Sequence, residues 1–245
     1  MTTKAYHAFK QKLFYFDYDL DLIDVLCTSV RKGELSDEES KFVLRNVDPK
    51  KHISIVRRQN RDTSRTAVMN HLRATLYSGY VKDVYEEVTH YLRTVLEKAA
   101  ENGFDAGRII GEHSFKLDAR AVLATGNWAA VATLIADSVF QSLEAEQSTL
   151  KLLQKVSIKL NLGVSDALID AALPYLEVRH FLVHTDGLLT SEFIKKNKKI
   201  KTRKRYVQLD FKFVAGMREA VKELVEEFDK KVIAANLLKP KDLHP

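Results

Sequence analysis

The spacing of apolar residues along the chain predicts a protein built mostly from helices. The strongest pattern covers residues 66–100, where apolar or small side chains recur every three or four positions: Ala74, Tyr77, Val81, Val84, Val88, Tyr91 and Val95. That spacing places them on one face of a single long helix. Gly103 is a suitable stop for this helix, because glycine is common just beyond a helix end.

Further helices are predicted in the second half of the chain. Three of them cover residues 128–143, 148–160 and 165–185, and the last contains Pro174 and is followed by Gly187. Residues 206–209 form a short predicted strand. Asp210 then caps a final helix with an apolar stripe at Val214, Met217, Val221, Leu224 and Phe228. Four or five amphipathic helices with short connections predict an all-α helical bundle.

The first 62 residues have shorter and weaker patterns. An acidic, apolar stretch at residues 18–30 ends at Gly33, and Ser36 with Glu39 forms a capping box that predicts a helix ending before Pro49. Residues 50–65 are basic and lack apolar periodicity, which is typical of a linker or exposed arm. We therefore expect a small helical N-terminal extension of unknown role (1–62), a bundle (63–238) and a short tail (239–245).

Composition agrees with long helices and excludes several classes of protein. Glycine and proline make up 13 of 245 residues, about 5%, well below the roughly 12% of ordinary proteins. The single Cys27 allows no intrachain disulfide and no cysteine zinc site, as is typical of a reducing compartment. The most apolar window, residues 128–136, is far shorter than the roughly 20 residues that span a bilayer. With no apolar secretion signal at the N-terminus, we expect a cytoplasmic protein without a membrane partner.

The charge excess is confined to one segment. The chain has 39 basic and 33 acidic residues. Eight of the basic residues lie within residues 195–205, which contain no acid, and the other 31 nearly balance the 33 acids. They are Lys195, Lys196, Lys198, Lys199, Lys201, Arg203, Lys204 and Arg205. Such a basic segment attracts phosphates without reading sequence, although a solvated loop is the plainer interpretation.

One segment carries candidate chemistry, and the common nucleotide and hydrolase motifs are absent. No glycine-rich phosphate loop, G-x-S-x-G elbow or H-E-x-x-H motif occurs. Residues 173–187 read LPYLEVRHFLVHTDG, with His180 and His184 one turn apart on a helix and Arg179 beside them. These groups suffice to cleave RNA without a metal: one takes the proton of the ribose 2′-hydroxyl, one stabilises the phosphate, and one protonates the leaving 5′-oxygen.

The sequence from Arg179 to His184, RHFLVH, resembles the R-x4-6-H motif of the HEPN superfamily, in which a polar residue commonly follows the arginine, as His180 does here. The resemblance covers the helices from about residue 66 to 237 and leaves out residues 1–62. It implies a HEPN-like core of four or five helices and, in many members, a metal-independent endoribonuclease with a composite site in a homodimer. It also implies a toxin–antitoxin or anti-phage setting, with an antitoxin or defence-system protein as inhibitory partner.

The motif spacing alone is weak, because three other pairs fit it. These are Arg45 with His52, Arg65 with His71, and Arg108 with His113. The apolar helix around Arg179 and His184 favours that pair, and Arg65 with His71 is the serious rival. At about 100° per residue, Arg179 and His184 lie about 140° apart on a helix. We therefore expect a distorted helix end or a second copy of the chain to bring them together.

The expected function is cleavage of single-stranded RNA to 2′,3′-cyclic phosphate and 5′-hydroxyl ends, with no metal or other cofactor. His184 is the expected main acid–base, Arg179 the phosphate stabiliser and His180 an orienting or second proton-transfer group, while the basic segment guides RNA. The alternative is a non-catalytic HEPN-like module that binds nucleic acid or protein, with structural histidines.

DNA binding through the cluster Arg57, Arg58, Arg61 and Arg65 ranks last among the functions. We expect Trp128 in the core rather than on a base-stacking surface. Glu86 and Glu87, on the long helix, are expected to be ordinary surface charges, although they are candidates to face the motif.

Overall fold

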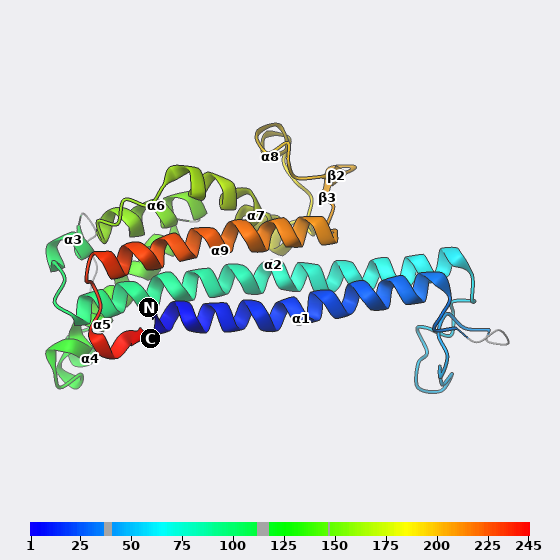
Figure 1. The fold of residues 1–245 in the computed structure, drawn as a ribbon, viewed down its shortest axis with the longest axis horizontal. Helices are drawn as coiled ribbons and strands as arrows, with labels where there is room; N and C mark the ends of the chain where they lie inside the picture. The colour runs from blue at the N-terminus through cyan, green and yellow to red at the C-terminus, as the bar shows by residue number, and fades with distance from the viewer. Residues whose placement is uncertain (37–40, 112–117, 147) are drawn as a thin grey trace.

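The chain folds into an elongated helical bundle (Figure 1), described by a computed structural model over residues 1–36, 41–111, 118–146 and 148–245. Three long helices run side by side: α1 (Lys4–Lys32), α2 (Asp62–Glu101) and α9 (Phe211–Ala234). The helix α1 is antiparallel to the other two. Strands are only two residues long in the described part, so the predicted all-α class is confirmed. No helix among the described residues is long and apolar enough to cross a membrane.

A second layer of shorter helices covers one side of α2 and α9. It consists of α3 (Ala106–Ile110), α5 (Trp128–Ala145), α6 (Thr149–Lys159) and α7 (Asp166–His184). The short helix α4 (Ala119–Ala124) buries no residue and lies at one end of the bundle (Figure 1). The predicted helices at 128–143, 148–160 and 165–185 correspond to α5, α6 and α7. Pro174 lies inside α7 without ending it. Trp128 is 72% exposed, so its expected core position is wrong: it is the first residue of α5 and faces solvent.

The first 32 residues belong to the bundle, and the expectation of an extension outside it is wrong for them. Tyr6, Phe9 and Leu13 on α1 lie in the same hydrophobic core as α2 and α9. The helix is followed by Gly33, where the acidic, apolar stretch of the sequence also ends and φ is 80°. Its apolar residues also occur on the outer face, so no single stripe marks the buried side in the sequence.

The predicted helix at residues 36–48 does not form in the part of this segment that the structure describes. Residues 41–48 form bends and turns, and Phe42 makes an isolated bridge with Gln59. The Ser36 hydroxyl donates to the Val43 carbonyl at 2.7 Å instead of capping a helix. Glu39, the other half of the expected capping box, lies outside the described residues. The connection from α1 to α2 is thus an arm at one end of the bundle (Figure 1).

The two chain ends are tied together at the opposite end of the bundle. Strands β1 (Thr2–Thr3) and β4 (Leu243–His244) pair antiparallel, after the short 3-10 helix η1 (Pro240–Asp242). Asp229 on α9, only 2% exposed, accepts hydrogen bonds from the Thr3 hydroxyl at 2.5 Å, the Thr3 amide at 3.2 Å and the Tyr91 hydroxyl at 3.3 Å. Burial raises the pKa of this carboxyl. The cluster joins α1, α2 and α9.

The outer face of α1 exposes a row of large apolar side chains. The row contains Phe14, Tyr15, Tyr18, Leu22, Val25 and Leu26. These positions lie within about a third of a turn around the helix axis, opposite the buried Leu20, Ile23 and Cys27. Exposed apolar rows of this kind are typical of surfaces that contact another molecule.

A compact projection rises from the bundle between α7 and α9 (Figure 1). It contains α8 (Ser191–Lys196) and the hairpin of β2 (Thr202–Arg203) and β3 (Tyr206–Val207), which includes part of the predicted strand at 206–209. Leu189, Phe193 and Ile200 anchor it in the core. Asp210 caps α9 as predicted, accepting a hydrogen bond from the Phe213 amide at 2.8 Å.

Candidate active site

The end of α7 presents the motif side chains. Near its end, α7 buries Leu176 and Val178, whereas His180 and His184 are exposed and Arg179 is partly buried. The helix stops at His184, and the amides of Thr185 and Gly187 both donate to the Phe181 carbonyl. Gly187 has φ of 85°, and a Cβ there would lie 3.2 Å from Val207, so a glycine is needed for this turn.

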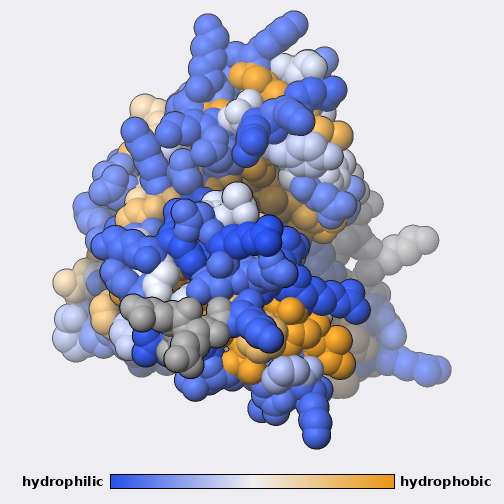
Figure 2. Space-filling view, turned by 90° about the vertical axis from the view of Figure 1, so that its right-hand side faces the viewer, coloured by the Kyte–Doolittle hydropathy of each residue, from blue (hydrophilic) through white to orange (hydrophobic). Residues whose placement is uncertain are grey.

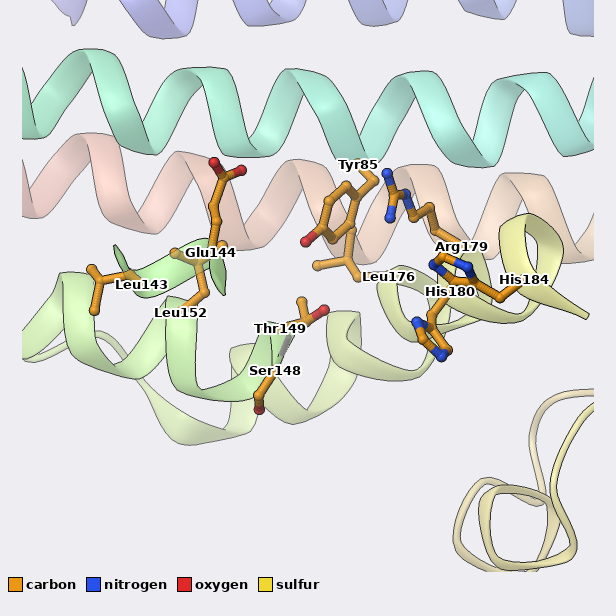
Figure 3. A pocket seen from close by; sticks show the side chains of 10 residues that line it. All are labelled: Tyr85, Leu143, Glu144, Ser148, Thr149, Leu152, Leu176, Arg179, His180 and His184. Carbon is orange, nitrogen blue, oxygen red and sulfur yellow. The ribbon is translucent and has the colours of Figure 1, made fainter. Parts of the chain in front are cut away.

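Arg179, His180 and His184 line one pocket of about 400 Å³, which we call the motif pocket. Figure 3 shows it between α2, α5, α6 and α7, with the two histidines at one end and Glu144 at the other. Its remaining lining residues are Tyr85, Leu143, Glu144, Ser148, Thr149, Leu152 and Leu176. All three predicted catalytic side chains therefore meet within a single chain.

The two histidine rings form a close pair. Their centres are 4.6 Å apart and their planes are tilted by 48°. Partial burial lowers the pKa of His180, and the nearby His184 and Arg179 lower it further. His180 is therefore mostly neutral at pH 7, the state that accepts a proton. Two rings at this spacing can exchange protons with two oxygens of one bound group.

Arg179 is held by an aromatic ring and keeps a free donor. Its guanidinium carbon lies 4.9 Å from the centre of the Tyr85 ring on α2, a typical cation–π distance. Its Nε is buried and has no hydrogen-bond partner among the described residues. Buried donors are nearly always satisfied in folded proteins. This one is an unpaired donor on a residue that lines the motif pocket.

We expected that only a distorted helix or a second chain could bring the Arg179 and His184 side chains to one site, and this expectation is wrong. Their Cα directions differ by about 140° on a regular helix, yet both side chains reach the same pocket. The arginine side chain is long enough to extend to Tyr85, as Figure 3 shows. A homodimer stays a prediction, but the site does not require it for this reason.

The acid that lines the motif pocket was missed in the sequence. Glu144 on α5 lines the motif pocket, while Glu86 and Glu87 do not. Arg93 on α2 donates to Glu144 at 2.9 Å, so the carboxylate is already paired. Tyr85 was also missed. Both come from helices distant in sequence, and no local pattern marks either one.

The basic segment is packed rather than loose, and its eight cations divide into two groups. Lys199 donates to the Ala171 carbonyl at 2.8 Å and lies over the Tyr175 ring, Lys201 pairs with Asp210, and Arg205 donates to the Leu189 carbonyl. Among the described residues, no hydrogen bond or ion pair holds the charged side chains of the other five: Lys195, Lys196, Lys198, Arg203 and Lys204. These five exposed cations are available to an anionic ligand.

The rival motif pairs have other roles or surroundings. The Arg65 guanidinium donates to Asn60 and pairs with Asp62, which fixes the start of α2. His71 lines a different groove. Arg45 and His52 lie in the turns of the arm, and His113 lies outside the described residues. Arg179 and His184, in contrast, line a common pocket.

Comparison with known proteins gives no further constraint. No family model, no curated protein and no solved structure matches this chain. Within the described residues, no three His, Cys, Asp or Glu side chains are grouped as metal ligands. The arrangement of the motif pocket is therefore the basis for a functional assignment.

Proposed function

We propose that the protein is a metal-independent endoribonuclease of HEPN type that cleaves single-stranded RNA. The observation that carries the proposal is the convergence of Arg179, His180 and His184 on one open pocket. The pocket combines two proton-transfer groups with a fixed cation. The first helix of the projection that bears the basic segment, α8, begins seven residues after His184. These are the groups that transesterification of RNA requires.

In the proposed reaction, neutral His180 removes the proton of a ribose 2′-hydroxyl. The 2′-oxygen attacks the adjacent phosphorus, the bond to the 5′-oxygen breaks, and protonated His184 gives that oxygen a proton. Arg179 donates to the phosphate oxygens as negative charge grows there. The products are a 2′,3′-cyclic phosphate and a 5′-hydroxyl. His184 keeps its expected acid–base role, and the lowered pKa of His180 favours the base role for that residue.

The free cations of the basic segment would attract RNA and would not select its sequence. Cytoplasmic location, a homodimer and an inhibitory antitoxin or defence-system partner are further parts of this proposal, and they depend on the HEPN resemblance. A toxin of this class would inhibit growth when overproduced, and His184→Ala would relieve the inhibition.

The decisive experiment uses the purified full chain and a labelled single-stranded RNA in the presence of EDTA. Wild type should release fragments ending in 2′,3′-cyclic phosphate, and Arg179→Ala/His184→Ala should not. His90→Ala is a matched control, because His90 is also exposed on a helix but does not line the motif pocket. If the double variant cleaves as fast as wild type, the assignment fails. If wild type binds RNA and leaves it intact, the protein is the non-catalytic module instead.

A further inference from the structure

A second cavity lies on the other side of the end of α7. It is a groove of about 730 Å³ between α2 and the projection, and we call it the Tyr206 groove. Figure 2 looks onto this end of the molecule and shows the surface hollowed below the hydrophilic projection. The groove is lined by His71, Ala74, Thr75, Ser78, Gly79, Lys82, Leu182, Asp186, Tyr206, Val207 and Leu209. Its residues differ from those of the motif pocket.

Tyr206 is an exposed aromatic residue on a rigid support. It is paired with Arg203 across the hairpin and with Leu188 on its other side, so two backbone neighbours fix it. The Val207 amide also donates to the Gly187 carbonyl at 3.0 Å. The side chain is nevertheless 48% exposed at the groove. A large aromatic ring that is held in place and left open to solvent is suited to stacking against a planar ligand.

Cations flank this ring. Arg203 is the direct cross-strand partner of Tyr206, and such partners project to the same side of a hairpin. The Arg203 side chain is exposed and has no hydrogen-bond or ion-pair partner among the described residues. Lys82 lies on the facing wall, on α2. Asp186 is the one carboxylate among the described residues that line the groove. The two cations Lys82 and Arg203 therefore outnumber the acids there.

The α2 wall of the groove is made of short side chains. Ala74, Thr75, Ser78 and Gly79 lie on one face of α2, and a Cβ built at Gly79 would meet no atom within 4 Å. The hydroxyl groups of Thr75 and Ser78 can bond to sugar or phosphate oxygens. An extended strand can therefore lie along this wall without a clash.

We propose that the Tyr206 groove binds a segment of single-stranded RNA, with a base stacked on Tyr206 and phosphates near Arg203 and Lys82. Stacking platforms combined with cationic grooves are the usual means of holding single strands without sequence preference. The proposal rests on the proposed function, because it extends the same RNA past the end of α7 into the motif pocket. The groove would hold the substrate, and the pocket would cleave it.

Binding is tested with a fluorescent 2′-O-methyl oligoribonucleotide, which cannot be cleaved by 2′-hydroxyl attack, and with single-stranded DNA and an RNA duplex of equal length. Tyr206→Ala should weaken single-strand binding about tenfold, since one stacked base contributes roughly that much, and Tyr206→Phe should keep it. Lys82→Gln should weaken binding and lower its salt dependence. The duplex should bind more weakly than either single strand.

Gly79 supplies a variant that does not alter the hairpin. Gly79→Gln places a side chain into the groove and should weaken single-strand binding. The substitution should make α2 more stable, because glutamine has a higher helix propensity than glycine. Gly79→Ala is the matched control, which gains helix propensity but leaves the groove open. If Tyr206→Ala and Gly79→Gln both bind like wild type, or if no single strand binds, the groove proposal is overturned. Groove-dependent binding without cleavage would instead overturn the enzyme assignment alone.

Discussion

The two sides of the α7 end differ in the chemistry of their side chains. The motif pocket holds two histidines 4.6 Å apart and an arginine with a free buried donor. The Tyr206 groove holds an exposed aromatic ring, a lysine and small polar side chains. Proton transfer needs groups that titrate near neutral pH, whereas holding a strand needs stacking surface and positive charge. If the proposed function holds, reaction and substrate binding are divided between adjacent cavities.

The largest expected effect is on the reaction step. His184→Ala removes the group that protonates the leaving oxygen, so kcat for RNA cleavage should fall about 10²- to 10⁴-fold. KM should change little, because the groove residues remain in place. Steady-state kinetics on a single-site RNA measures both values. A mainly raised KM would place His184 in substrate binding and break the division between the two cavities.

The next effect is on RNA binding, and it should change KM rather than kcat. Tyr206→Ala removes a stacking contact of about 1–3 kcal/mol, so KM for RNA should rise with kcat nearly constant. Measuring both parameters beside those of His184→Ala sharpens the comparison directly. A fall in kcat with unchanged KM would show that Tyr206 acts on the reacting groups rather than on the strand.

A smaller effect concerns protonation in the motif pocket. The pKa of His180 is lowered from its ordinary value of 6.5 by burial, His184 and Arg179, in that order. Its contribution to folding is therefore fully present above pH 6.5 and decreases as the pH falls through that value. NMR titration of the ring should give a pKa below 6.5, and His184→Ala should raise it more than Arg179→Ala does. A His180 pKa at or above 6.5 in wild type would remove the reason for naming it the base.

Sequence periodicity predicted α2, α5, α6, α7 and α9 because each buries one face and exposes the other. It failed for α1, whose outer row includes Phe14, Tyr18 and Val25, so apolar residues surround the helix. The capping box at Ser36 failed because its hydroxyl bonds to Val43 instead. A capping-box sequence does not show whether its serine hydroxyl will bond to a different part of the chain in the folded protein.

The candidate site was only partly predictable for a similar reason. Arg179, His180 and His184 are neighbours in one helix, so a short motif can contain them. Tyr85 and Glu144 come from α2 and α5, and only folding brings them to the same pocket. Even the angle between Arg179 and His184 was misleading, because it measures Cα directions and not the reach of a long side chain.

The smallest expected effect lies at the tip of the hairpin, where stability and binding should change in opposite directions. Lys204 and Arg205 form its two-residue turn with φ of 52° and 69°. This turn favours asparagine and glycine, and a left-handed residue of another type is less stable by about 1 kcal/mol. Lys204→Asn should therefore raise the free energy of unfolding by up to about 1 kcal/mol, measured by urea denaturation.

Lys204→Asn also removes an exposed cation near the Tyr206 groove, so the salt dependence of RNA binding should decrease by about one charge. Lys241→Asn, near the C-terminus at the other end of the bundle, is the control for charge alone. If both variants change the salt dependence equally, the attraction comes from net charge and not from the hairpin. Lys204→Asn should be more stable and bind RNA less tightly, and Lys241→Asn should show neither change. That result would indicate that Lys204 lowers the stability of the turn but contributes to binding phosphate.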